Sequence, residues 1–236
     1  MVEPEIFASI RSILDRMEAA ARRSGRKAAE VTLLAVSKTK PLETVVAAAR
    51  TGLVTHFGEN RVQEGQAKIP GFPAELGAVW HLIGHLQRNK ARKAVELFDV
   101  IESIDGEGIA AAVERVCAEK DKRLDVLIEV NSSGEASKTG TPAAEVPALA
   151  DFVRGQCPHL KLQGLMTIGP LGGDERAVRG AFDATRELRD RLRLSADDLP
   201  CLSMGMSGDN ENAIREGATL VRIGTAIYGE RDYSKK

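Results

Sequence analysis

Apolar, β-branched runs alternate with amphipathic stretches along most of this chain. The first run, at residues 31–38, is almost wholly apolar, as expected for a strand covered on both faces. The amphipathic stretch at 42–52 ends at a glycine, a common stop signal for a helix. We predict strands at 31–38, 55–60, 78–84, 99–105, 124–131, 160–169, 201–207 and 219–229, and helices at 42–52, 61–69, 88–98, 108–121, 143–156, around 181–193 and at 209–217.

Eight strands separated by seven helices indicate an α/β fold, a closed parallel (β/α)8 TIM barrel. The length of 236 residues suits one such barrel, since these domains run to ~250 residues. We therefore expect a single domain over 1–236, in which an amphipathic helix within 1–30 packs on the barrel. A doubly wound open sheet is the competing fold, but it usually has a glycine-rich turn after its first strand, whereas SKTKP follows here.

Composition and charge exclude several classes of protein. The 33 basic and 34 acidic residues leave a formal net charge of −1, which gives no reason to expect nucleic acid or an anionic membrane as a partner. The first residues do not resemble a signal peptide, and no stretch has the ~20 apolar residues that span a bilayer. Because Cys117, Cys157 and Cys201 lack the spacing of a zinc or redox site, we expect reduced, buried thiols in a cytoplasmic protein.

Most residues at the C-terminal ends of the predicted strands, where barrels of this kind bind their ligands, are polar. In chain order the residues at these ends are Lys38, Glu59, Asn60, His81, His85, Asp105, Asn131, Met166, Thr167, Ser207, Arg222, Gly224 and Thr225. A scaffold without a ligand would not need this concentration of polar groups. The sequence therefore predicts a binding site at this end of the barrel.

Lys38 ends the first apolar strand. Burial would disfavour its charged form, and a neutral lysine amine can form a Schiff base with an aldehyde. The other interpretation is a solvated loop lysine, like the nearby Lys40. Spacing alone favours the solvated lysine.

The segment SMGMSGDNENAI combines close-approach glycines with the hydroxyls of Ser203 and Ser207, just before a predicted helix. Free amides at such a point suit a phosphate, and phosphate sites recur after strands seven and eight of these barrels. The last strand adds Gly224 and Thr225. Ordinary turns have a similar composition, but two such segments in the right strands favour the phosphate. Arg222 shares a strand face with Gly224 and so points into the same space.

Two other features indicate no further site. The basic run RNKARK at 88–93 is typical of a solvated helix face. His81 and His85 stand four residues apart, but Gly84 lies between them in a strand context, which argues against a helical zinc pair. We expect no metal.

Seven motifs follow one another along nearly the whole chain: LLAVSKTKP (33–41), HFGENRVQEG (56–65), WHLIGHLQRNK (80–90), NSSGEASKTG (131–140), GLMTIG (164–169), SMGMSGD (203–209) and VRIGTAIYG (221–229). With these motifs the sequence resembles the YggS/PROSC family of pyridoxal 5′-phosphate (PLP)-binding proteins, the PLP homeostasis proteins. The resemblance implies a barrel like the N-terminal domain of alanine racemase.

The resemblance also implies how PLP is held. The lysine that carries PLP matches Lys38, the arginine at the pyridine nitrogen matches Arg222, and the lysine expected to assist PLP handling matches Lys138. The expected cofactor-binding residues are Lys38, Asn60, Lys138, Met166, Ser203, Met206, Ser207, Arg222, Gly224 and Thr225.

An arginine at the pyridine nitrogen makes PLP a weaker electron sink than a carboxylate partner does. Alanine racemase shares the arginine but adds a second domain and a tyrosine base, whereas this sequence ends at Lys236. We therefore expect a non-catalytic carrier or regulator in intracellular PLP (vitamin B6) homeostasis. We expect a monomer whose partners are PLP and PLP-dependent apo-enzymes.

Two alternatives remain open at this stage. The first is a PLP-dependent amino-acid racemase in which Lys38 also acts as a base. The second is an isomerase of phosphorylated sugars that lacks PLP and uses Glu59 and His81 as an acid and base pair.

Overall fold

A computed structural model of the protein describes residues 3–132, 139–170, 172–195 and 198–229. The strands are β1 (Thr32–Val36), β2 (His56–Glu59), β3 (Val79–Leu82), β4 (Val100–Ile104), β5 (Leu124–Asn131), β6 (Thr141–Pro142), β7 (Leu160–Thr167), β8 (Cys201–Ser203) and β9 (Leu220–Ile223). The α-helices are α1 (Glu3–Arg23), α2 (Leu42–Arg50), α3 (Val62–Lys68), α4 (Ala91–Leu97), α5 (Glu107–Glu119), α6 (Val146–Gln156), α7 (Glu175–Leu192), α8 (Asn210–Arg215) and α9 (Thr225–Tyr228). Short 3-10 turns are η1 (Ala28–Glu30), η2 (Ile69–Gly71), η3 (Ala74–Leu76) and η4 (Arg88–Lys90).

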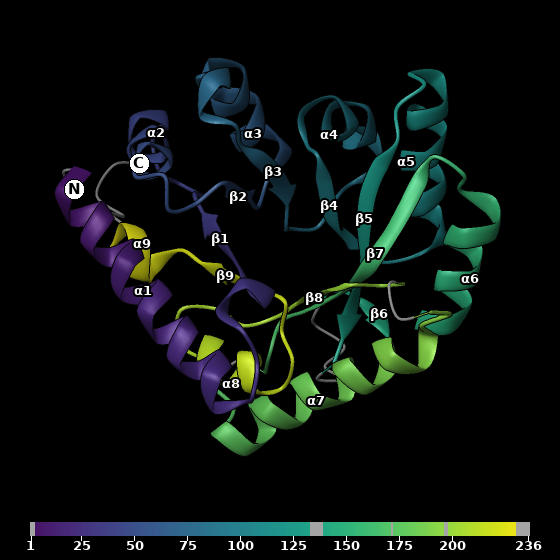
Figure 1. The fold of residues 1–236 in the computed structure, drawn as a ribbon. Helices are drawn as coiled ribbons and strands as arrows, with labels where there is room; N and C mark the ends of the chain where they lie inside the picture. Colours follow the sequence, from purple (N-terminus) through teal and green to yellow (C-terminus); the bar gives the residue numbers. More distant parts are fainter. Residues whose placement is uncertain (1–2, 133–138, 171, 196–197, 230–236) are drawn as a thin grey trace.

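Eight of the strands close into the parallel barrel that the sequence predicts. The order around the barrel is β1, β2, β3, β4, β5, β7, β8 and β9, and β9 pairs back onto β1. The helices surround the strands (Figure 1). The two-residue β6, which the hydrophobic pattern does not predict, extends the sheet by pairing with the end of β5.

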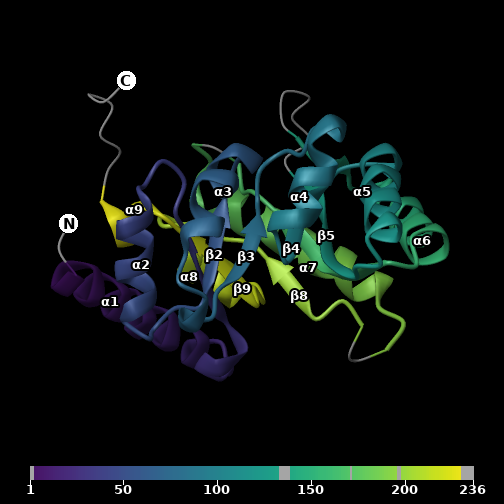
Figure 2. The same cartoon turned by 90° about the horizontal axis from the view of Figure 1, so that it is seen from above.

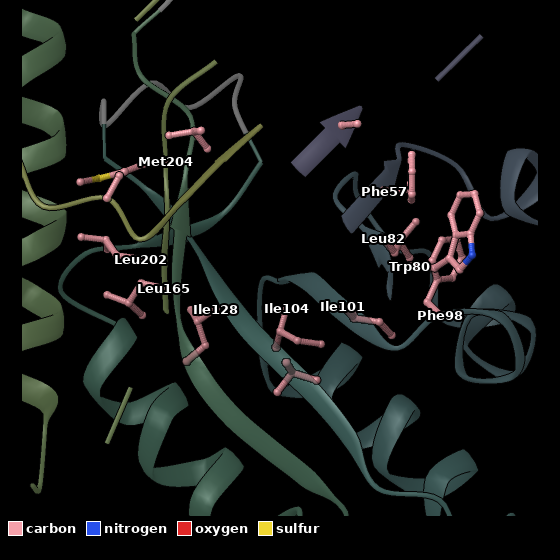
Figure 3. Close-up of a cluster of buried hydrophobic side chains, with 14 of the residues drawn as sticks. Phe57, Trp80, Leu82, Phe98, Ile101, Ile104, Ile128, Leu165, Leu202 and Met204 are labelled. Carbon is pink, nitrogen blue, oxygen red and sulfur yellow. The ribbon is translucent and has the colours of Figure 1, made fainter. Parts of the chain in front are cut away.

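Side chains alternate between two layers, as they must along a strand. On β1, Leu33 and Ala35 join the large core between the barrel and its helices. Leu34 and Val36 point the other way and pack with Leu220 inside the barrel. Figure 3 shows part of the outer core, with buried residues of successive strands packed near the surrounding helices.

The N-terminal helix α1 packs beside the barrel rather than across its bottom. It contacts α2, α8 and α9, and Figure 2 shows it next to α2 and α8. The predicted apolar stripe forms the contact, since Ile6, Ile10, Ile13 and Met17 are buried. This helix therefore covers the side of the barrel that carries β1 and β9.

The last two predicted strands are too long. The pattern predicts a strand to residue 229, but β9 ends at Ile223 and α9 follows, because the chain turns at Gly224 with φ −116° and ψ −72°. The pattern also predicts a strand to residue 207, but β8 ends at Ser203. Gly205 has a φ of +92°, a left-handed conformation that glycine adopts readily, and a Cβ there would lie 2.5 Å from that of Ala213.

The part of the chain that the structure describes has no membrane-spanning helix and no cluster of metal ligands. No helix there is long and apolar enough to cross a membrane. No group of three or more His, Cys, Asp or Glu side chains within these ranges is placed to hold a metal ion. Cys117, Cys157 and Cys201 are free thiols, and burial raises the pKa of Cys117 to about 11.

Candidate functional site

A cavity of about 310 Å³ opens at the C-terminal ends of the strands, where the sequence places the site. Its lining comes from the ends of β1 and β9 and from the loops that follow β1, β2, β3, β7, β8 and β9. The lining residues are Val36, Lys38, Thr39, Lys40, Asn60, Ile83, Ile168, Met206, Ser207, Gly208, Arg222, Gly224, Thr225 and Gly229. The walls thus combine apolar side chains with two lysines, an arginine and several backbone amides.

Lys38 lies at one side of this cavity, two residues after β1 ends. The neighbouring residue, Ser37, is fully buried and faces the helix layer. Its amide donates to the carbonyl of Gly58 at 3.0 Å, and its hydroxyl donates to Glu59 Oε1 at 2.7 Å. The backbone that carries Lys38 is therefore fixed to β2.

A buried ion pair strengthens this attachment. Lys68 Nζ lies 2.7 Å from Glu59 Oε1 and also donates to the carbonyl of Ser37 at 2.7 Å. Burial raises the pKa of Glu59, an effect that the charge of Lys68 opposes. Because both charged groups are withdrawn from water, removing either one would leave an uncompensated buried charge. The pair therefore fixes the position of Ser37 and of the neighbouring Lys38.

Backbone amides gather at another wall of the cavity. The amides of Ser207, Gly208 and Thr225 donate to none of the residues that the structure describes. The Ser207 hydroxyl accepts a long hydrogen bond from the Ala226 amide at 3.4 Å, so its own hydrogen can serve a ligand. This wall offers several donors and suits an anion with several acceptor oxygens.

The loop that supplies these amides is held by side chains behind it. Asn210 Nδ2 donates to the carbonyls of Met206 at 3.0 Å and Ser207 at 3.3 Å. Asp209 Oδ1 accepts from the Met206 amide at 2.5 Å. The loop therefore presents its free amides without relying on a bound ligand for its shape.

Arg222 forms part of the cavity lining but is only 4% exposed. It lies on β9 and points into the barrel, beside Leu34 of β1. Nη1 donates to Ser203 Oγ at 2.6 Å and Nη2 to the carbonyl of Thr167 at 2.7 Å. Burial lowers the pKa of Arg222, and the charge of Glu102 opposes that effect. The guanidinium has further N–H groups that it can offer to a ligand.

Behind Arg222, polar side chains continue through the barrel interior. Ser203 Oγ donates to Glu102 Oε2 at 2.6 Å, and Glu102 Oε1 lies 2.7 Å from His81 Nδ1. His81 Nε2 lies 2.9 Å from His56 Nδ1. Glu102 is absent from the set of residues expected from the sequence. The available signal is a single acid inside a fully buried strand whose other residues are uncharged.

The structure brings most of the expected residues together. The cavity lining includes Lys38, Asn60, Met206, Ser207, Arg222, Gly224 and Thr225. Ser203 lies one layer deeper, against Arg222. Met166 is fully buried in the barrel interior, where it packs with Val100 and Leu127 away from the lining. Lys138 lies outside the described residues.

The lining also contains residues outside the expected set, among them Lys40 and Ile83. Lys40, interpreted from the sequence as a solvated lysine, donates to the carbonyl of Tyr228 at 2.9 Å and so ties the β1 loop to α9. Ile83 forms part of the apolar wall. Its loop approaches Asn60 closely at Gly84, where a Cβ would lie 2.3 Å from the Asn60 carbonyl oxygen.

The pair proposed for a sugar-phosphate isomerase does not share a site. Glu59 faces the helix layer, where Lys68 and Ser37 bind it. His81 lies inside the barrel against Glu102. Neither side chain contributes to the lining as far as the structure describes it, so the two cannot act together on one substrate in this cavity.

The chain is similar to known proteins over nearly its whole length. The family model described as "Alanine racemase, N-terminal domain" matches residues 13–232. A pyridoxal phosphate homeostasis protein of Vibrio cholerae is 44% identical over 98% of this chain and 98% of its own length. A solved structure of an unknown protein from Bifidobacterium adolescentis is 40% identical, with a TM-score of 0.90 over 96% of this chain and 95% of that one. PipY of Synechococcus elongatus, solved with PLP bound, is 36% identical, with a TM-score of 0.76 over 92% of this chain and 100% of its own.

His56, at the outer end of the polar chain in the barrel, should make stability depend on pH. Burial, followed by the charge of His81, lowers the pKa of His56 from 6.5 to about 4. Between these values the unfolded chain binds a proton that the folded chain does not, so the free energy of unfolding falls as the pH falls. We expect the free energy of unfolding, measured with urea, to fall between about pH 7 and about pH 5. This fall should be about 1 kcal/mol smaller in His56→Gln than in the unaltered protein, after allowance for the partial exposure of His56. Equal losses in both proteins would show that His56 does not titrate in this way.

Proposed function

The chain belongs to the family of pyridoxal phosphate homeostasis proteins, and from this premise we propose that it binds PLP covalently through Lys38 and takes part in intracellular PLP homeostasis. One observation carries the proposal: a lysine, a group of free amides and a buried arginine converge on one cavity. PLP supplies an aldehyde that reacts with a lysine amine, a phosphate, and a pyridine ring that withdraws electrons when it is protonated. The cavity has a complementary group for each of these parts.

Lys38 is the residue that we propose for the covalent bond. Its amine condenses with the aldehyde, with loss of water, to give a Schiff base. Val36 and Ile83 add apolar surface to the same cavity. The anchoring of Ser37 holds the attachment point in place.

The phosphate fits the wall formed by Ser207, Gly208 and Thr225. Their amides and the Ser207 hydroxyl supply donors to a group that has only acceptors at neutral pH. Gly224 allows the close approach between strands that this wall requires, because a Cβ there would lie 3.2 Å from the Val36 carbonyl oxygen. Met206 belongs to the same loop and lines the cavity beside it.

Arg222 is the partner that we propose for the pyridine nitrogen. A guanidinium can only donate hydrogen bonds, so it favours a ring nitrogen that is unprotonated and accepts. It does not act as a carboxylate partner would, and the ring therefore withdraws electrons weakly.

The rest of the lining supports a non-catalytic role. Among the lining residues that the structure describes there is no carboxylate, imidazole or phenol that could act as a second base. The relatives' name, pyridoxal phosphate homeostasis protein, supports storage or delivery of PLP rather than turnover. We therefore propose a carrier or regulator.

Several features extend the proposal. We place the protein in the cytoplasm, where its free thiols suit a reducing environment. We take it to be a monomer that delivers PLP to PLP-dependent apo-enzymes. We also treat residues 1–236 as one domain, which the packing of α1 on α2, α8 and α9 supports. We propose that Asn60 binds PLP and that Lys138 assists in its handling.

The second candidate is a PLP-dependent amino-acid racemase. One observation favours it: the matching family model describes a domain of alanine racemase, and Lys38 and Arg222 would serve that reaction as well. A racemase would interconvert the L- and D-forms of an amino acid, whereas the proposed carrier would leave amino acids unchanged.

Titration with PLP tests the covalent bond. The protein should develop a near-visible absorption band as PLP is added, and Lys38→Ala should not, because it lacks the amine. Lys40→Ala is the matched control, since it removes a lysine from the same cavity wall. The band should persist in the control at saturating PLP. A band of equal intensity in Lys38→Ala would refute the assignment.

Comparison of PLP with pyridoxal, which lacks the phosphate, tests the anion wall. Ser207→Ala should weaken the binding of PLP about tenfold, because it removes a hydrogen bond to a charged group. The affinity for pyridoxal should stay the same. If Ser207→Ala weakens both ligands equally, or neither, the phosphate does not contact Ser207.

Chiral analysis of amino acids tests the racemase alternative. The PLP-loaded protein should leave a panel of L-amino acids unchanged beyond the rate with free PLP, since the described lining offers no second base. Racemisation that disappears in Lys38→Ala would establish an enzyme and overturn the carrier role.

A further inference from the structure

A continuous series of hydrogen bonds crosses the interior of the barrel and ends on Arg222. It runs from His56 on β2 to His81 on β3, then to Glu102 on β4, Ser203 on β8 and Arg222 on β9. The distances along it are 2.9, 2.7, 2.6 and 2.6 Å. The interior of such barrels is usually filled by layers of branched apolar side chains, so this series of polar groups is a departure that needs a reason.

The direction of three of these bonds is fixed by chemistry. Arg222 can only donate, so Ser203 Oγ accepts from it. The single hydrogen of the Ser203 hydroxyl must therefore go to Glu102. Glu102 accepts from both sides, and His81 must carry a hydrogen on Nδ1. A carboxylate at position 102 is thus the acceptor to which the donors on both sides point.

The charges in this series compensate one another. Glu102 and Ser203 are fully buried, and Arg222 is 4% exposed. Burial alone would raise the pKa of Glu102, but His81, Arg222 and Ser203 together lower it, so the carboxylate stays ionised. Glu129 also lies near Arg222, but burial raises the pKa of Glu129, which makes it a weaker source of negative charge. Glu102 is therefore the main counter-charge of the guanidinium.

Resting on the proposed function, we propose that Glu102 and Ser203 are positioning residues for Arg222: they hold its guanidinium at the cavity with N–H groups directed to the pyridine nitrogen of bound PLP. Neither residue touches the cavity as the structure describes it. They act through Arg222, whose hydrogen bonds to Ser203 and Thr167 fix the plane of the guanidinium. The effect of losing them should therefore appear at the ring nitrogen and nowhere else in PLP.

This specificity defines the experiment. Glu102→Gln keeps the size of the side chain but removes the charge and one of the two acceptors. Glu114→Gln is the matched control, because Glu114 makes the same kind of bond to a histidine, His159, at the same 2.7 Å, but on α5 outside the barrel. The probes are PLP and its deaza analogue, in which a C–H group replaces the ring nitrogen.

Glu102→Gln should bind PLP about tenfold more weakly and shift the absorption maximum of bound PLP, because Arg222 loses its orientation. It should bind the deaza analogue within about twofold of the unaltered protein, and Glu114→Gln should match the unaltered protein for both probes. An equal loss of affinity for both probes would show a merely structural role and overturn the inference. So would unchanged affinity and an unchanged spectrum.

Ser203→Ala provides a second variant if Glu102→Gln does not fold. It removes one hydroxyl and breaks the same series between Glu102 and Arg222. Ser103→Ala is its control, since Ser103 is equally buried but donates to the Gly84 carbonyl instead. The expected pattern is the same selective loss for PLP. If the unaltered protein itself binds no PLP at Lys38, the proposed function fails; if it binds PLP and the variants lose both probes in parallel, the inference alone fails.

Discussion

Burial of the Arg222 charge inside a closed barrel is the constraint on which the rest of the site depends. A guanidinium that is 4% exposed must be compensated and hydrogen-bonded, because an unpaired charge in such a place is very unfavourable. The compensation comes from Glu102 on β4, Ser203 on β8 and the Thr167 carbonyl on β7. Contacts that define one wall of the cavity therefore also tie together strands from different parts of the barrel.

A second buried group of charges fixes the end of β1, which neighbours the strand that carries Arg222. Lys68 and Glu59 form hydrogen bonds with Ser37 in the helix layer, so the end of β1 that carries Lys38 has a fixed position relative to β2. The amide-lined loop is held in its turn by Asn210 and Asp209. Lys38, Arg222 and the loop of Met206 and Ser207 are thus each held by buried polar contacts outside the cavity lining.

The sequence predicts the parts of this structure that depend on local pattern. The apolar run that ends at Lys38 and the position of Arg222 within the last strand follow from the alternation of residues, and both side chains line the cavity. The ends of the last two strands do not follow from it, because the turns at Gly205 and Gly224 depend on close contacts with Ala213 and Val36 that pattern alone does not reveal.

The partners of Arg222 could not be predicted for a similar reason. Glu102 and Ser203 lie 101 positions apart, and only closure of the barrel brings them together. Met166 shows the reverse case: it lies near the end of its strand, yet its side chain fills the interior with Val100 and Leu127. Ile168, two residues further along the chain, lines the cavity instead, so the predicted end of a strand does not by itself give the depth of a side chain.

The central claim is that Lys38 holds PLP covalently in the cavity that Arg222 completes. Reduction of the PLP-loaded protein with borohydride fixes such a bond, and peptide mass spectrometry then locates it. We expect the added mass of the reduced adduct on Lys38. Adducts spread over surface lysines, or an adduct confined to Lys40, would contradict the account.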